Sequence, residues 1–176
     1  MVEVRESTII HAGRGLFAQR DFDVGEVIFE EEVIACLRDQ IMVSGKLFSG
    51  VSTAWPLVCK FLLEGTPSWF TSLTSNKRLC LVHLNDTKDK ELMMELMNHP
   101  CCKGKNIIDI FGKTVSNHFA APVLGGVMNC MSLGRLSSMM NHKEDPNTVS
   151  AGMFIESGVD EEHRYKVRFK AAKPIF

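Results

Sequence analysis

The chain has 176 residues, of which 45% are hydrophobic and 8% aromatic, enough for one domain of ordinary size with a real core. Its formal net charge of -1 excludes recognition by bulk electrostatics, so we expect a partner to be bound at a local site, with no direct nucleic-acid binding and no membrane binding. No apolar run reaches the roughly 18 residues of a membrane span, and the sequence begins MVEVREST without a hydrophobic signal segment, so we expect a nuclear or cytoplasmic protein.

The first residues, 2 to 34, alternate glycine-containing turns with β-rich pieces. GLFAQR and EVIFEEEVI have strand composition and flank the turn DFDVGE, which predicts two short antiparallel strands. We take 1–37 as a segment of N-terminal strands.

Helical patterns fill the middle of the chain. VSTAWPLVCKFLLEG has apolar residues at helical spacing before Gly65, which is well placed as a stop. In KDKELMMELMNHP, we expect Leu92, Met93, Leu96 and Met97 on one apolar face. The third pattern, NIIDIFGKTVSNHF, repeats Ile107, Ile108, Phe111 and Val115 at helical spacing. These patterns predict a helical insert over 38–125.

Short strands return after the insert. NTVSAGMFIE and HRYKVRFKAA both have strand composition, and the charged turn SGVDEE separates them. We expect C-terminal strands over 126–176, with Lys166, Arg168, Lys170 and Lys173 on one solvated face. Strands at both ends with helices between them indicate an α+β fold with non-local strand pairing, organised as a single domain over 1–176.

The six cysteines stand at positions 36, 59, 80, 101, 102 and 130, without a CxxC pair. This spacing disfavours a zinc ribbon or finger, and adjacent cysteines seldom share one metal ion. Isolated histidines such as His11 and His83 have no partner at ligand spacing. We therefore expect reduced, mostly buried thiols and no metal site, and we expect the methionines to fill the core.

The glycine-rich stretch AGRGLFAQRDFDVGEVI is the first candidate for a binding segment. Gly13 and Gly15 let the backbone bend sharply and approach a ligand closely, and Asp23 and Gly25 build a second turn. The alternative is a hairpin whose glycines serve geometry alone. No helix follows this GxG, so it is not a dinucleotide-binding fingerprint.

The second candidate is NHKEDPN, which follows the methionine-rich run SLGRLSSMM. Asn141 offers an amide donor and a carbonyl acceptor to a heteroaromatic edge, and His142 offers two ring nitrogens. The alternative is an Asx turn that leads into a strand. Asn117, followed by His118 and Phe119, is a similar polar pair beside an aromatic residue, for which the alternative is a satisfied helix C-cap.

Together and in this order, the motifs resemble the SET-domain protein methyltransferases. GRGLFAQRDFDVGEVI is similar to that family's N-terminal signature, LSSMMNHKEDPN resembles its NHSCxPN segment, and RYKVRFKAAKPI resembles the strand that follows. A helical insert that ends in an asparagine and an aromatic residue, as Asn117 and Phe119 do, is also similar to SET proteins with a long insert. The resemblance implies small curved β-sheets packed around the insert.

The resemblance also implies S-adenosylmethionine as the cofactor and a protein lysine, of a histone or another protein, as the substrate. By the same resemblance, Gly13, Arg14 and Gly15 contact the cofactor near its methionine end. Asn141 and His142 lie near the adenine and the amino acid portion, and Asn117 is a further contact. The implied reaction is methyl transfer from a sulfonium to a lysine amine in a narrow apolar channel.

Two departures from the family pattern affect the expected activity. Lys143 and Glu144 replace the family's Ser-Cys, so a cysteine that some members use for zinc is missing. After AAKPI the family continues with a Gly-Glu-Glu segment and a tyrosine at the channel, whereas this sequence ends at Phe176 and its single tyrosine, Tyr165, does not match. Either the sequence is a truncated form of a longer protein, or it belongs to a member that lost the catalytic end. We therefore assign no catalytic residue and expect weak or absent methyl transfer by residues 1–176. The alternative function is a non-catalytic interaction module.

Overall fold

A computed structural model describes residues 1–8, 14–36, 40–123, 128–140, 153–159, 165–171 and 174–175. The chain divides into two compact units. The first comprises Met1–Ile34, Ala120–Asn129 and Gly134–Phe176, and the second comprises Ala35–Phe119 and Cys130–Leu133. The first unit therefore combines segments from both ends of the sequence.

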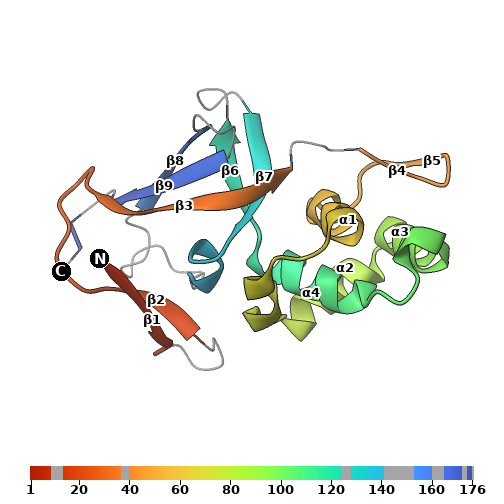
Figure 1. Ribbon diagram of the computed structural model, residues 1–176, viewed down its shortest axis with the longest axis horizontal. Helices are drawn as coiled ribbons and strands as arrows, with labels where there is room; N and C mark the ends of the chain where they lie inside the picture. The colour runs from red at the N-terminus through yellow and green to blue at the C-terminus, as the bar shows by residue number, and fades with distance from the viewer. Residues whose placement is uncertain are drawn as a thin grey trace. The chain divides into compact units, whose positions relative to one another are not determined.

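The first unit is built from antiparallel strands that are far apart in the sequence (Figure 1). One sheet has the order β6-β7-β3-β9-β8, and a separate pair joins β1 to β2. The strands are β1 (Val2–Glu6), β2 (Arg14–Ala18), β3 (Val27–Cys36), β6 (Phe119–Val123), β7 (Met128–Gly134), β8 (Met153–Val159) and β9 (Tyr165–Ala171), with the 3-10 turn η4 (Ser137–Met139) after β7. The two strands predicted near the N-terminus are present as β2 and β3, but they do not pair with each other.

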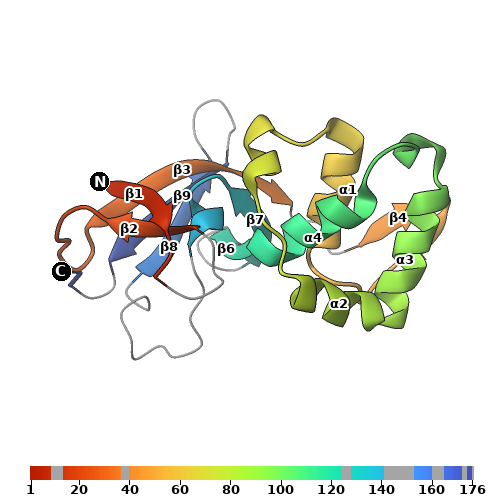
Figure 2. The same ribbon diagram turned by 90° about the horizontal axis from the view of Figure 1, so that it is seen from below.

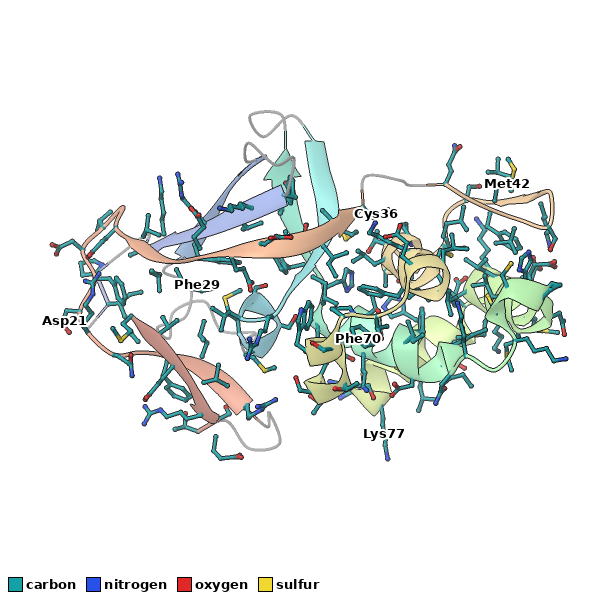
Figure 3. The ribbon with its side chains drawn as sticks, viewed as in Figure 1. Asp21, Phe29, Cys36, Met42, Phe70 and Lys77 are labelled. Atoms are coloured by element: carbon teal, nitrogen blue, oxygen red, sulfur yellow. The ribbon has the colours of Figure 1, made fainter. Side chains whose placement is uncertain are left out.

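Strand β3 instead pairs with β9, which places the N-terminal segment against the C-terminal one. Phe29, labelled in Figure 3, stacks on its cross-strand partner Phe169 with ring centroids 4.5 Å apart. On the opposite face, Glu30 lies across from Arg168 and forms ion pairs with Arg168 and Lys166. The alternation predicted for β9 is confirmed over its described residues.

The predicted turn at DFDVGE is also present and connects to the end of the chain. Glu26 N donates to Asp23 O at 3.0 Å, and Gly25 adopts the positive φ of 83° that favours glycine. Gly25 N donates to Ala171 O at 2.7 Å, and Ala171 N donates to Glu26 O at 2.9 Å. The turn is thus fixed by strand-like hydrogen bonds to the C-terminal residues.

The second unit contains the helical part of the chain (Figure 2). Its elements are the hairpin β4 (Ile41–Val43) and β5 (Lys46–Phe48), the helices α1 (Trp55–Glu64), α2 (Lys77–Asn85), α3 (Thr87–Asn98) and α4 (Ile107–Asn117), and the 3-10 turns η1 (Ser68–Ser72) and η2 (Pro100–Cys102). Side-chain caps define three helix starts, because Asn76, Asp86 and Asn106 each accept a hydrogen bond from a first-turn amide.

The core of this unit surrounds Trp55, which is fully buried and packs against Phe111 with ring centroids 4.4 Å apart. Leu62 of α1, Leu92 of α3 and Phe48 of the hairpin belong to the same cluster. Three elements that are distant in sequence thus share one apolar core, which stabilises helices that would be only marginally stable in isolation.

The three predicted helices are confirmed as α1, α3 and α4, with differences at their surfaces. Helix α1 begins at Trp55 because Pro56 suits the first turn, and Gly65 ends it with a φ of 92°. Met97 and Ile108, which the sequence placed on apolar faces, are more than half exposed. The β4–β5 hairpin and α2 lay inside the predicted insert without being predicted.

Strand β8 extends to Val159, so the first half of the predicted turn SGVDEE belongs to a strand. The start of the predicted strand NTVSAGMFIE and the residue Lys173 lie outside the described residues. Within the described part of the chain, no helix combines the length and apolar character required to cross a membrane. Antiparallel sheets and a separate helical block confirm the predicted α+β class.

Candidate functional site

The glycine-rich signature forms strand β2, which pairs with β1 from its first residue. Arg14 lies opposite Glu6, and Gly15 lies opposite Arg5. Gly15 is buried, whereas Arg14 is exposed at the strand start. A buried glycine gives a neighbouring group access to backbone N–H and C=O that a larger residue would shield. The strand therefore presents one buried backbone position beside one cationic side chain.

Strand β2 lies beside turn η4, which belongs to the same unit. This turn consists of Ser137–Met139 and directly precedes the residues of the NHKEDPN motif in sequence. The fold therefore brings the N-terminal signature next to the residues that lead into the second signature. More than 115 positions separate the two segments in sequence, so their approach depends on the tertiary fold.

A glutamate on β3 holds turn η4. Glu31 lies on the same face of the strand as buried Phe29 and Val33, because side chains alternate along a strand. One carboxylate oxygen of Glu31 accepts a hydrogen bond from Leu136 N at 2.7 Å, and the other accepts one from Ser137 N at 2.8 Å. Both bonds are charge-assisted and short. The carboxylate thus caps the first amides of η4.

The space around this carboxylate is tight. Gly134 is buried, and a Cβ there would overlap Glu31 Oε1 and lie 2.6 Å from Ser137 Oγ. Ser137 is 4% exposed, and its hydroxyl has no hydrogen-bond partner among the residues that the structure describes. A buried hydroxyl without a partner costs free energy unless a further polar group reaches it. A polar ligand or a water molecule at this place would remove that cost.

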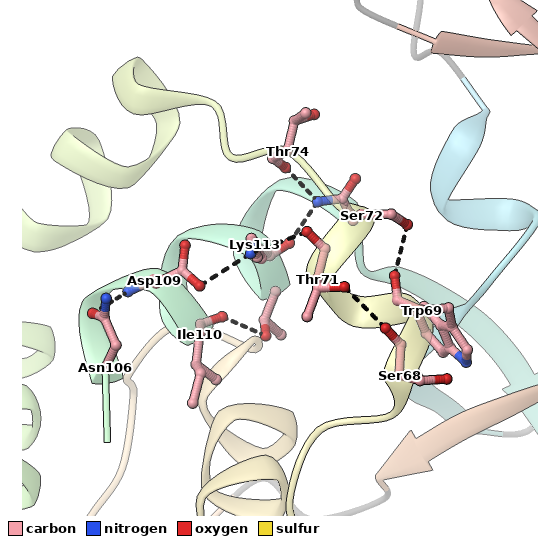
Figure 4. Close-up of polar contacts among 11 residues, drawn as sticks. Ser68, Trp69, Thr71, Ser72, Thr74, Asn106, Asp109, Ile110 and Lys113 are labelled. Atoms are coloured by element: carbon pink, nitrogen blue, oxygen red, sulfur yellow. Dashed lines mark hydrogen bonds and ion pairs between the residues drawn. The ribbon is translucent and has the colours of Figure 1, made fainter. Parts of the chain in front are cut away.

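Asn117 lies in the second unit, at the end of α4. Its side-chain Nδ2 donates to Lys113 O at 2.6 Å and to Thr74 O at 2.8 Å. Figure 4 shows Lys113 and Thr74 among the polar contacts of this region, where Lys113 also pairs with Asp109 at 3.1 Å. The structure therefore shows the capping role that was the alternative for Asn117. Its cofactor role stays a prediction.

His118 follows as the C-cap residue of α4. Its Nδ1 lies 3.1 Å from Thr114 O, and its Nε2 lies 3.4 Å from Thr53 Oγ1. Burial lowers the pKa of His118 below its ordinary value of 6.5, which favours the neutral ring. Neutral His118 is therefore part of the support of this helix end.

The remaining predicted contacts, Gly13, Asn141 and His142, lie outside the described residues. Tyr165, which the sequence did not match to a catalytic tyrosine, is the first residue of β9 and lies opposite Val159. The structure thus describes Arg14, Gly15 and Asn117 of the predicted set. It places the first two in one unit and Asn117 in the other.

The thiols do not form a metal centre in the described part of the chain. No group of three or more His, Cys, Asp or Glu side chains has an arrangement suited to a metal ion among these residues. Cys36, Cys59, Cys80, Cys101 and Cys102 are free thiols. Burial raises the pKa of Cys59 to about 12, which keeps this thiol protonated and a poor ligand or nucleophile at neutral pH.

The sequence reasoning missed Glu31, Ser137 and Gly134. A signal for Glu31 was present in FEEEVI, because period-two alternation puts the middle glutamate on the face of Phe29 and Val33. A carboxylate on an apolar face needs a hydrogen-bonding partner. The partner itself, turn η4, could not be read from the sequence.

Comparison with known families assigns the chain. The SET domain family model matches residues 13–176, nearly the whole sequence. The chain therefore belongs to the SET-domain family, which confirms the resemblance seen in its two signatures. A comparison with curated proteins gives no match.

Proposed function

We propose that this SET domain binds S-adenosylmethionine and transfers its methyl group to a lysine of a protein substrate. Gly13, Arg14, Gly15, Asn141 and His142 would hold the cofactor, as the family resemblance implies. The proposed substrates include histones, and the protein would act in the nucleus or the cytoplasm. The observation that supports the proposal most directly is the position of β2 beside η4, because it joins the two signature segments in one unit.

The described residues fit a ligand that is both polar and partly apolar. Gly15 offers buried backbone, and the Ser137 hydroxyl is a buried polar group without a partner in the described part of the chain. Phe29 is buried on the same face of β3 as Glu31 and excludes water on that side. Such a mixture of apolar walls and few polar groups is typical of a small-molecule site.

When bound, S-adenosylmethionine would supply an electrophilic methyl group for a neutral lysine amine, with S-adenosylhomocysteine as the leaving group. The chain contributes orientation and exclusion of water. Gly15 allows close approach of backbone groups, Arg14 adds a positive charge at the strand start, and the stacked rings of Phe29 and Phe169 keep the neighbouring interior apolar. An apolar surrounding favours the neutral amine over the charged one.

The binding step is tested by calorimetric titration of S-adenosylmethionine into the wild-type chain and three single variants. We expect Asn141→Ala to weaken binding more than Lys143→Ala or Glu144→Ala. Loss of a buried amide partner costs about 1–3 kcal/mol, whereas loss of a solvated charge costs less. Equal affinities for all three variants would remove Asn141 from the site.

The alternative, a non-catalytic interaction module, has support from the outer surface of the helical unit. None of the residues of α2 is fully buried, and Leu81 and Val82 on its outer face are about 60% exposed. Exposed large apolar side chains of this kind occur at protein interfaces. A chain that binds S-adenosylmethionine but methylates no protein in a histone or cell-extract mixture would favour this alternative.

A further inference from the structure

We propose that Glu31 is a positioning residue of the cofactor site, whose carboxylate fixes turn η4 at its place beside β2. The inference rests on the proposed function, because it assumes that the site between these two segments binds S-adenosylmethionine. Glu31 itself need not touch the ligand. It acts through Leu136 and Ser137, the residues where the turn begins.

The two hydrogen bonds of Glu31 are long-range contacts. Their donors, Leu136 N and Ser137 N, are 105 and 106 positions from Glu31 in sequence, and their lengths are 2.7 and 2.8 Å. An ionised carboxylate accepts hydrogen bonds at both oxygens, so one side chain satisfies two consecutive backbone amides. Hydrogen bonds to a charged group are about twice as strong as neutral ones. The turn is therefore fixed to the sheet at its first two amides.

The neighbouring Glu30 on β3 has a different environment from Glu31. Glu30 lies on the opposite face and pairs with Arg168 and Lys166 at the surface. Glu31 instead faces inward, half-buried, opposite the fully buried Val167. An inward carboxylate is costly to desolvate unless it is hydrogen-bonded. Its function in this fold is thus to bind the η4 amides.

Gly134 and Ser138 limit how turn η4 can move. A Cβ at Gly134 would overlap the Glu31 carboxylate, so only glycine leaves room for it. Ser138 Oγ donates to Gly134 O, which closes the same turn from its other side. Asn141 follows Ser137 by four positions. A displacement of η4 would therefore move the chain at the point where the second signature begins.

Glutamine is the informative replacement, because it keeps the shape of glutamate and changes only its acceptors. In Glu31→Gln, one oxygen still accepts a hydrogen bond, but the NH₂ group meets a backbone N–H that can only donate. We expect the Kd for S-adenosylmethionine to rise at least about tenfold, the change expected when a hydrogen bond to a charged group is lost. In Glu30→Gln, which alters an exposed ion pair, we expect an unchanged Kd.

A second control separates positioning from general stability. Val33→Ala removes buried apolar volume from the same face of β3 without touching the carboxylate. We expect Val33→Ala to lower Tm at least as much as Glu31→Gln while its Kd stays at the wild-type value, both measured well below either Tm. Amide hydrogen exchange should become faster at Leu136 and Ser137 in Glu31→Gln and remain slow there in Val33→Ala.

Gly134→Ala gives an independent test from the other side of the contact. The new methyl group displaces the carboxylate, so we expect the same loss of affinity with all of the glutamates intact. Wild-type Kd values for both Glu31→Gln and Gly134→Ala would overturn the inference. So would a failure of both variants to fold while Val33→Ala folds, because Glu31 would then be a general determinant of folding. A wild-type chain that binds no S-adenosylmethionine would instead contradict the proposed function, and faster exchange at Leu136 in Glu31→Gln would still establish the anchor.

Discussion

The buried carboxylate of Asp89 gives the sharpest prediction about stability. Asp89, on α3, is 2% exposed, and its Oδ1 accepts hydrogen bonds from Trp55 Nε1 and from Ser52 N, each at 2.8 Å. Its Oδ2 lies 3.6 Å from His83 Nδ1. One carboxylate therefore links α3 to the start of α1 and to α2, at the edge of the core around Trp55.

Asp89→Ala removes the acceptor from two donors at once. Leaving a buried donor without a partner costs about 1–3 kcal/mol, so the two donors together cost about 2–6 kcal/mol. A domain is typically stable by about 5–15 kcal/mol, so this substitution removes a large fraction of that stability. Asp89→Asn retains the oxygen that both donors use and should cost only about 1 kcal/mol.

The assay is urea unfolding followed by tryptophan fluorescence, for which Trp55 itself is a reporter. Asp86→Ala is the matched control, because Asp86 is a surface-exposed N-cap residue of the same helix and its loss should cost about 1 kcal/mol. We expect the order of destabilisation to be Asp89→Ala, then Asp86→Ala and Asp89→Asn. If Asp89→Ala lowers the free energy of unfolding no more than Asp86→Ala does, the reasoning is refuted.

Three further predictions concern single residues. Burial raises the pKa of Cys59 to about 12, so the stability that Cys59 contributes below the ordinary thiol pKa of 9.0 is lost as the pH rises from 9.0 towards 12. Cys59→Ala should flatten this loss in unfolding curves. At pH 8, alkylation followed by mass spectrometry should modify exposed Cys101 before Cys59. Burial lowers the pKa of His118, so stability should fall as pH decreases below 6.5 through the folded-state pKa, and His118→Asn should lessen this slope. Gly25→Ala should lower the free energy of unfolding by about 1–2 kcal/mol, because Gly25 has a φ of 83°. A urea unfolding curve identical to that of the wild type would contradict this prediction.

Local patterns explain which elements could be predicted. Helix α4 was predictable because Ile107, Phe111 and Val115 recur at helical spacing and all three are buried. Strand β9 was predictable because Val167, Phe169 and Ala171 alternate with charged residues. By contrast, α2 buries none of its residues fully, so its sequence lacks a marked apolar face. The hairpin β4–β5 is short, and its Met42, labelled in Figure 3, is 72% exposed.

Pairings between distant segments could not be predicted from local patterns. The strands β2 and β3 adjoin in sequence, yet β2 pairs with β1 and β3 pairs with β9. Register across such distances depends on which faces are buried together in the folded chain. The same limit applies to the site. Its two signatures were recognisable by their residues, whereas the Glu31 contact with η4 became visible only in three dimensions.

The most direct test of the proposed cofactor site is photo-crosslinking with S-adenosylmethionine labelled in its methyl group, followed by peptide mapping. We predict that the label attaches to peptides that contain β2 or residues 131–147, and that an excess of unlabelled S-adenosylhomocysteine prevents it. Asn141→Ala should reduce the labelling, and Lys143→Ala should not. Absence of competable label, or label found only on α1 to α4, would contradict the account.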